Sequence, residues 1–449
     1  MPSLTIAADC LLTDIPFALE KAIKDRLTID NPKYISAKRF GRWIAKDLKA
    51  KLYYYESVPG GLRFPRGFAN QAVLLCREYL KQTPAIIDNR LLLDEVPFVF
   101  SGTMRPYQER ALLATEKRSF GVIEAGTGSG KTVMALAIIA SRAQPTLVVV
   151  HTKELLYQWQ KRIDEFLGCE AGLVGDGHFD LRNITVAIVN TARKRIKELA
   201  PRFGHLVVDE CHRVPASLFT DVVSNFDGQY LLGLSATAFR NDDGLTRLIY
   251  FYMGDRIHKV EMEELQESGA IVKPELVRCK TTFQYAYSGD YQPLVSALTK
   301  DSARNKQILA DVIVECKRKD SGICLLVSDR ISHCQLFEQK LLAAGVDVAL
   351  LTGQTSADQR SAIVENVQNG NVEVLVATLQ LIGEGFDCSG LSTLFLTTPI
   401  TFEGRLLQIL GRIMRPAKGK RARVYDYVDE SVSVLKRSAA SRKKILAAF

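Results

Sequence analysis

Several features that mark specialised classes of protein are missing from this sequence. It contains 2 Trp in 449 residues, no low-complexity tract, and no apolar run near the roughly 18 residues of a membrane span. Its 9 cysteines are scattered, and none forms a C-x-x-C pair. We therefore expect no disulfide framework, zinc ribbon or iron–sulfur cluster, and a protein of the reducing cytoplasm with no membrane partner.

What the chain does have is the composition of a folded globular protein of two or three domains. Hydrophobic residues make up 47% and charged residues 24%, and the net charge is +9. The positive excess lies near the two ends: residues 33–66 hold nine Lys or Arg against two acidic residues, and residues 404–449 hold twelve against three. Charge alone fits either solvated basic faces or surfaces that bind nucleic acid.

The middle and end of the chain alternate short β-branched runs with amphipathic helical stretches, which predicts parallel sheets covered by helices. The fold class is therefore α/β, with two doubly wound lobes. The predicted strands of the first lobe are 121–124, 146–151, 184–189, 205–208 and 230–234, and those of the second lobe are 323–328, 347–351, 372–377, 393–397 and 423–427.

Residues 1–95 follow a different pattern and predict a small, separate, basic α+β domain. Its expected strands and helix are 27–30, 34–41, 51–57, 61–64 and 68–82. We expect it to be separable, so that its removal leaves a foldable remainder. The full division predicted is 1–95 for this domain, 96–260 for the first lobe, 261–300 for the connection between lobes, and 301–449 for the second lobe with a basic tail.

A phosphate-binding loop is the strongest local signal. The segment AGTGSGKT, from Ala125 to Thr132, stands between a predicted strand and a helix, where backbone N–H groups and the helix dipole can hold phosphates. Lys131 would contact the β and γ phosphates, and Thr132 would offer its hydroxyl to Mg²⁺. Ala125 stands where the usual pattern has glycine. The expected nucleotide-binding residues here are Gly126, Thr127, Gly128, Ser129, Gly130, Lys131 and Thr132.

An acidic pair follows the predicted strand 205–208. Asp209 would hold Mg²⁺ through its water shell, and Glu210 would accept a proton from the attacking water. Alone, such a pair is often the start of a helix. Together with the phosphate loop it predicts a site that hydrolyses a nucleoside triphosphate.

These segments resemble motifs of the superfamily 2 helicases and translocases: AGTGSGKT resembles motif I, DECH at 209–212 motif II, and Ser-Ala-Thr at 235–237 motif III. The resemblance implies two RecA-like lobes, with ATP and Mg²⁺ as cofactors. Arg105 and Gln108, in R-P-Y-Q, are similar to the element that reads adenine. Motifs Ia and Ib imply nucleic-acid contacts at Thr152, Lys153 and Thr191, and Arg240 is a further expected contact.

The second lobe completes the resemblance. Gln408 to Pro416 is similar to motif VI, which makes Arg412 and Arg415 arginine-finger candidates on one helical face, with Gln408 nearby. Residues 374–387 are similar to motif V. In that motif Thr378 would contact a nucleic-acid phosphate, and Gly383 and Asp387 would serve the nucleotide and the attacking water. Thr352 would meet the tracking strand.

The sequence LSATAFR followed by Asp242-Asp243 is most similar to the XPB-like and UvsW-like branch of DECH-box enzymes. That branch implies a DNA-stimulated ATPase acting on duplex, forked or four-way DNA, in repair, recombination or replication, including branch migration, in a prokaryotic or phage-infected cell. Members of that branch also begin with a small DNA-binding domain, although no motif matches residues 1–95 to it. The basic surplus of residues 33–66 predicts that this domain binds DNA, with Tyr53–Tyr55 and Phe64-Pro65-Arg66 as expected contacts. An RNA helicase, the motor subunit of a restriction-type nuclease complex, and an ATP-gated clamp are the alternatives.

Overall fold

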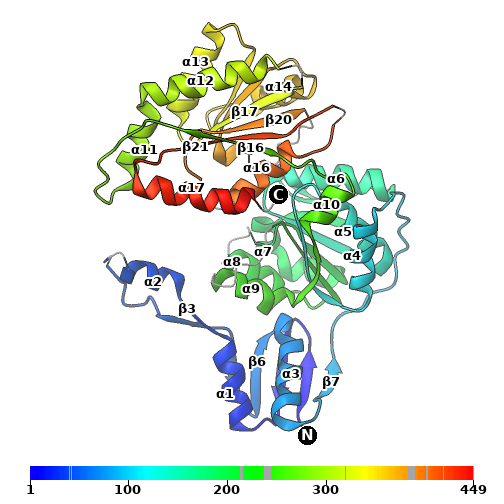
Figure 1. Cartoon of the computed structure of the whole chain (residues 1–449). Helices are drawn as coiled ribbons and strands as arrows, with labels where there is room; N and C mark the ends of the chain where they lie inside the picture. The colour runs from blue at the N-terminus through cyan, green and yellow to red at the C-terminus, as the bar shows by residue number, and fades with distance from the viewer. Residues whose placement is uncertain are drawn as a thin grey trace. The chain divides into compact units, whose positions relative to one another are not determined.

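The chain divides into two compact units in the computed structural model (Figure 1). The first unit comprises residues 1–125 and 130–260, and the second comprises 126–129 and 261–449. The structure describes residues 1–39, 41, 43–212, 216–236, 244–318, 320–382, 390–400, 403–417 and 419–447. The predicted site residues Arg240, Gly383 and Asp387 lie outside the described residues.

The first unit begins with a small sheet of its own. Leu4, Leu12, Leu62 and Phe64 alternate with more exposed residues along three of its strands and are buried, as expected for a sheet with one covered face. Helices α1 (Phe17–Arg26) and α3 (Ala69–Leu80) pack against each other beside it. In the order β5-β6-β2-β1-β7, the strands are Glu56–Val58, Gly61–Pro65, Asp9–Thr13, Ser3–Ile6 and Ala85–Asp88.

One predicted strand of this region is wrong. Residues 34–41 were expected to be extended, but Pro32–Arg39 form helix α2. The cause is local: the Asn31 side chain accepts a hydrogen bond from the backbone N–H of Lys33 at 3.0 Å, and Pro32 has the φ of a first helical residue. The expected strand 51–57 is divided, because β4 (Lys51–Tyr53) pairs with β3 (Thr28–Asp30) whereas β5 pairs with β6.

The first lobe contains a sheet in which only the edge strand β11 is antiparallel among the strands described. Its central strands are buried apolar runs, which confirms the predicted strands. Strand β15 was not predicted, because its sequence RIHKV buries only Val260. In the order β11-β10-β12-β9-β13-β14-β8-β15, the strands are His178–Phe179, Gly172–Gly175, Ile184–Ile188, Thr146–Val150, His205–Val208, Tyr230–Ser235, Phe120–Ala125 and Arg256–Val260.

The helices of this lobe follow its strands in the alternation expected of a doubly wound fold. They are α4 (Pro106–Glu116), α5 (Lys131–Arg142), α6 (Lys153–Leu167), α7 (Val189–Leu199), α8 (Ala216–Val223) and α9 (Gly244–Met253). In the described part of the chain, no helix has the length and apolarity needed to cross a membrane.

The small N-terminal sheet is packed onto the first lobe. Arg66 is 1% exposed and donates hydrogen bonds to the backbone oxygens of Gly228 and Ala7, at 2.8 and 3.2 Å. A Cβ atom at Gly67 would lie 2.4 Å from the Gly254 nitrogen, and the rings of Phe68 and Phe251 are in edge contact. Arg66 is therefore buried and does not face DNA as predicted. One hydrophobic core spans both parts, so this domain does not pack separately from the first lobe. That the chain still folds without residues 1–95 stays a prediction.

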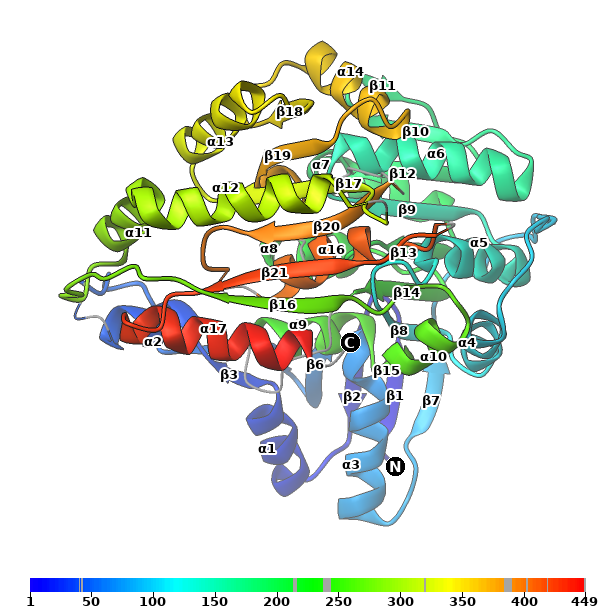
Figure 2. The same cartoon turned by 45° about the horizontal axis from the view of Figure 1, so that its top comes forward.

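The second unit contains a parallel sheet, also confirming the predicted fold class. Helices α12 (Ser302–Cys316) and α13 (Ile331–Ala343) pack on the face presented by Cys324 and Leu326 (Figure 2). In the order β16-β21-β20-β17-β19-β18, the strands are Glu275–Lys280, Arg423–Val428, Leu391–Leu396, Ile323–Ser328, Val374–Thr378 and Val348–Leu351. The remaining helices are α10 (Met262–Glu267), α11 (Tyr291–Lys300), α14 (Ala357–Gln368), α15 (Leu379–Ile382), α16 (Glu403–Ile413) and α17 (Ser433–Leu446).

Residues 261–300, which the sequence predicts to be only a connection between the lobes, also contain a strand. Strand β16 lies within this range and pairs in parallel with β21 along its whole length. Each of its residues is half-buried or exposed, so the fully buried apolar run that identifies the inner strands is absent. This stretch therefore contributes an edge strand to the second sheet.

Candidate functional site

The loop between β8 and α5 has the backbone that a phosphate cradle needs. Gly128 and Gly130 have φ of +89° and +76°, a region that residues with a Cβ rarely adopt. A Cβ at Gly130 would lie 2.5 Å from Nε2 of Gln108. The positive φ values therefore favour glycine at both positions. The loop leads directly into the N-terminus of α5, where an anion is stabilised.

Lys131, the first residue of α5, points its ammonium at the end of the sheet. Its Nζ donates to the Ala125 carbonyl at 3.2 Å and lies 3.4 Å from Oε1 of Glu210. Both side chains are largely buried, with 11% and 16% of their surface exposed. The structure thus brings the predicted phosphate-binding lysine and the predicted base together, next to Thr132 in the same helical turn.

Asp209 is held by a partner that the sequence analysis missed. Its Oδ2 accepts a hydrogen bond from Nε1 of Trp159 at 2.8 Å, and its Oδ1 accepts one from the Glu210 backbone N–H at 2.9 Å. Burial, together with the nearby Glu210 charge, raises the pKa of Asp209 to about 6, and the Trp159 hydrogen bond opposes that rise. Trp159 stands next to Gln158 in motif Ia, but nothing in its spacing indicates a carboxylate 50 residues away.

Glu210 is in a strained backbone conformation, with φ of +46°. Such strain is common at active sites. Its Oε2 lies 3.4 Å from Nδ1 of His212, and the Ser235 hydroxyl lies 3.1 Å from the same ring nitrogen. Motifs II and III are thus in contact through Glu210, His212 and Ser235, while Thr237 of motif III lies outside the described residues.

Gln108 is buried at the start of α4. Its Oε1 accepts a hydrogen bond from the backbone N–H of Arg105 at 2.8 Å, which caps the helix, and its Nε2 lies against Gly130. The structure therefore places Gln108 beside the phosphate loop. Its pairing with adenine stays a prediction, and the Arg105 side chain contacts the Tyr107 hydroxyl at 3.4 Å.

The expected nucleic-acid contacts of the first lobe lie at the same edge of the sheet as Asp209. Strands β9 and β12 are parallel, with Val150 opposite Ile188, so Thr152 and Thr191 follow the same ends. The Thr152 hydroxyl accepts a hydrogen bond from the Leu155 N–H at 3.3 Å and caps α6. The cap leaves its O–H donor available for a phosphate oxygen, and Lys153 next to it is exposed.

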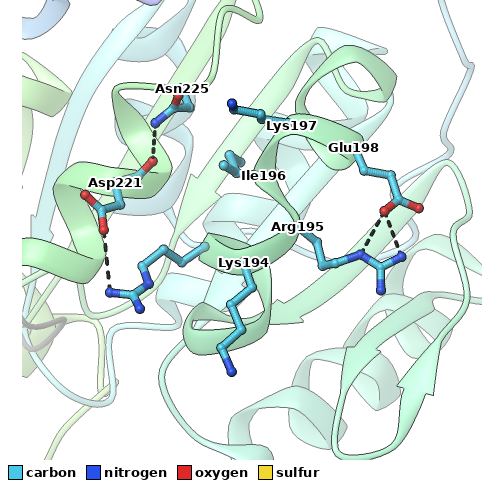
Figure 3. Close-up of a pocket in the computed structure, with 8 residues that line it drawn as sticks. Lys194, Arg195, Ile196, Lys197, Glu198, Asp221 and Asn225 are labelled. Atoms are coloured by element: carbon cyan, nitrogen blue, oxygen red, sulfur yellow. Dashed lines mark hydrogen bonds and ion pairs between the residues drawn. The ribbon is translucent and has the colours of Figure 1, made fainter.

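Helix α7 presents a basic surface beyond Thr191, where a hollow lies between α7 and α8 (Figure 3). Arg193 is 3.6 Å from Asp221, and Arg195 pairs with Glu198 at 2.7 Å. The hollow contains none of the nucleotide-site groups. Its lining residues are Arg193, Lys194, Arg195, Ile196, Lys197, Glu198, Asp221 and Asn225.

In the second unit, two of the predicted nucleic-acid contacts lie at the same edge of the sheet. Leu351 of β18 is opposite Ala377 of β19, so Thr352 and Thr378 come next in register at the carboxyl ends of neighbouring parallel strands. The Thr352 hydroxyl accepts from the Gln354 N–H at 3.3 Å, and Thr352 is 4% exposed. Thr378 is more accessible and is the better placed of the two for a ligand.

The arginine-finger candidates differ from the expected geometry. Gln408 and Arg412 lie in α16, but the helix ends at Ile413, so Arg415 follows the helix and does not share its face with Arg412. The Arg415 carbonyl accepts a hydrogen bond from Lys420 at 2.7 Å. Gln408 is 5% exposed, and its Oε1 has no hydrogen-bond partner among the residues described, an unsatisfied acceptor suited to a bound ligand.

Comparison with known proteins gives matches to both units. The family described as "Type III restriction enzyme, res subunit" matches residues 101–240, and the "Helicase conserved C-terminal domain" matches residues 304–417. The "DNA 3'-5' translocase XPB2" of Sulfurisphaera tokodaii is 26% identical over 404 residues, covering 82% of this chain and 91% of the relative. The "Probable helicase D10" of Escherichia phage T5 is 28% identical, covering 67% and 65%. The crystal structure of T4 UvsW aligns over 99% and 97% of the two chains, with 16% identity and a TM-score of 0.45.

Proposed function

Because this chain is a superfamily 2 helicase, and therefore an enzyme that hydrolyses ATP, we propose that it is a DNA translocase that opens or migrates duplex, forked or four-way DNA. The observation that carries the proposal is the set of contacts at one sheet edge. Lys131, Glu210, Asp209 and Trp159 form one connected cluster there, and Thr152 follows a neighbouring strand at the same edge.

The residues present fit ATP and Mg²⁺. The glycines at 128 and 130 leave the loop backbone open, Lys131 supplies a cation for the β and γ phosphates, and Thr132 and Asp209 would hold Mg²⁺. ATP supplies the phosphoanhydride bond whose hydrolysis drives movement. Glu210 is the proposed base, because its carboxylate lies beside Lys131 and Asp209 and is positioned by the strained backbone.

Arg412 and Arg415 are the proposed donors of positive charge to the transition state, and Gln408 lies one helical turn before Arg412 in α16. Gln108 and Arg105 remain the proposed adenine-side residues. The proposed DNA-backbone contacts are Thr152, Lys153, Thr191, Thr352 and Thr378.

The experiment that tests this function is an ATPase titration of the wild-type chain. Single-stranded, blunt duplex, forked and four-way DNA, and single-stranded RNA of matched length, are each added at several concentrations. We expect forked and four-way DNA to raise the turnover most. Stimulation by RNA and not by DNA would instead indicate an RNA helicase.

One observation favours a second candidate. The family matched by residues 101–240 is described as the res subunit of type III restriction enzymes, which makes the motor of a nuclease complex the second candidate function. In that case blunt duplex DNA would stimulate ATP hydrolysis as strongly as branched DNA, since a motor that tracks along duplex needs no branch.

A further inference from the structure

The segment 31–50 forms an arm that joins β3 to β4, the two strands of a small sheet separate from the five-stranded N-terminal sheet. It begins and ends at neighbouring residues, because β3 and β4 pair antiparallel, with Asp30 opposite Lys51. Asn31 closes its base: the side-chain amide donates to the Lys49 carbonyl at 2.8 Å, and the backbone N–H donates to the Ala50 carbonyl at 2.9 Å. Figure 1 shows β3 and α2 extending away from α1, β6 and α3.

The arm has no core of its own in the part that is described. Between residues 32 and 50, none of the side chains whose burial is described is buried. Trp43 is 84% exposed and Ile35 is 49% exposed, whereas Trp159, the other tryptophan of the chain, is 1% exposed. An aromatic side chain that stays in contact with water contributes little to the free energy of folding. The exposure of Trp43 therefore indicates a surface that binds a partner.

The charge of the arm selects that partner. Residues 31–50 contain six Lys or Arg and one Asp. The lysines at 33, 38, 46 and 49 form no ion pair with any residue that the structure describes. Unpaired lysines around an exposed indole suit a polyanion with aromatic bases, because phosphates bind the cations and a base can stack on the ring.

We propose that this arm recognises the branch point of DNA, with Lys33, Lys38, Lys46 and Lys49 on the phosphates and Trp43 stacked on a base exposed where the duplex opens. The proposal deepens the proposed function and rests on it. Stacking on Trp43 favours a fork over blunt duplex. A base at a fork is already partly unstacked, whereas an indole inserted into intact duplex must first separate two stacked base pairs.

The test compares Trp43→Ala with Phe17→Ala, which removes another aromatic ring, 78% exposed, from α1 of the same region. Stacking on one base predicts that Trp43→Ala weakens binding of forked DNA by about 5-fold to about 150-fold, and of blunt duplex by less than about twofold. Phe17→Ala should match wild type on both. Replacing the four lysines with Gln should make the salt dependence of binding shallower, by roughly 0.9 in log–log slope for each duplex phosphate lost.

A second readout does not depend on affinity. Acrylamide should quench the fluorescence of Trp43 in the free protein, and forked DNA should protect it, whereas Trp43→Phe retains only the buried Trp159 signal. The proposal is overturned if wild type binds forked DNA and is stimulated by it, while Trp43→Ala binds equally well and Trp43 stays quenchable. That result would assign the arm to a protein partner. If no DNA stimulates wild type or Phe17→Ala, the proposed function itself has failed.

Discussion

Replacing Trp159 with Phe removes one hydrogen bond from the carboxylate that is proposed to hold Mg²⁺. The indole N–H lies 2.8 Å from Oδ2 of Asp209, and both side chains are buried. A hydrogen bond to a charged group contributes about 1.5 to 3 kcal/mol, which corresponds to about 1 to 2 pKa units at 1.36 kcal/mol per unit. The bond stabilises the ionised form, so its loss raises the pKa of Asp209 further above about 6.

Asp209 must be ionised to hold Mg²⁺, so activity falls as pH falls through its pKa. In wild type the acid limb of kcat/KM should lie near pH 6, and in Trp159→Phe, without this hydrogen bond, it should lie at about pH 7 to 8. More Mg²⁺ should restore the variant at neutral pH, because the ion competes with the proton.

The control is Phe226→Leu, a change of volume at another fully buried aromatic side chain, one that has no polar group. It should lower thermal stability without moving the acid limb. An unchanged pH profile and Mg²⁺ requirement in Trp159→Phe would show that Trp159 serves packing alone and would refute its role in positioning Asp209.

Lys131→Ala should abolish nucleotide binding, as measured by titration with a fluorescent nucleotide. Glu210→Gln should still bind ATP but release no phosphate. Near-normal turnover in Glu210→Gln would show that another residue is the base. Arg415→Ala should lower kcat by about 10³-fold with little loss of DNA affinity, and the reverse result would place Arg415 on DNA. Arg66→Met should lower the Tm by roughly 4 °C, because two backbone carbonyls lose their hydrogen-bond donor. A Tm within about 1 °C of wild type would show that Arg66 does not stabilise the packing of the N-terminal sheet on the first lobe.

The inner strands of both lobes could be predicted from sequence because they are buried on both faces and form short continuous apolar runs. Strand β17 is an example, with every residue from Ile323 to Ser328 buried. Edge strands such as β15 and β16 lack that signal, since one side faces solvent or carries charge. The strand predicted at 34–41 was wrong because it did not take account of Asn31-Pro32, which is a helix-start signal.

The order of motifs identified the groups of the candidate site, but not the contacts between them. Lys131 beside Glu210 could be expected, because each follows the end of a strand in one parallel sheet. The link from Trp159 to Asp209 could not, because it depends on the direction in which α6 places one side chain across the sheet edge. Arg66 was assigned to DNA from its charge, and only the packing of the N-terminal sheet on α9 shows that it is buried.

The most direct test of a branch-acting DNA motor is the fate of a synthetic four-way junction. With ATP, the wild-type chain should convert the labelled junction into forked or duplex products. Glu210→Gln should bind the same junction and release no product, because it lacks the proposed base. A junction that wild type leaves intact, together with ATP hydrolysis stimulated equally by junction, blunt duplex and RNA, would contradict the account.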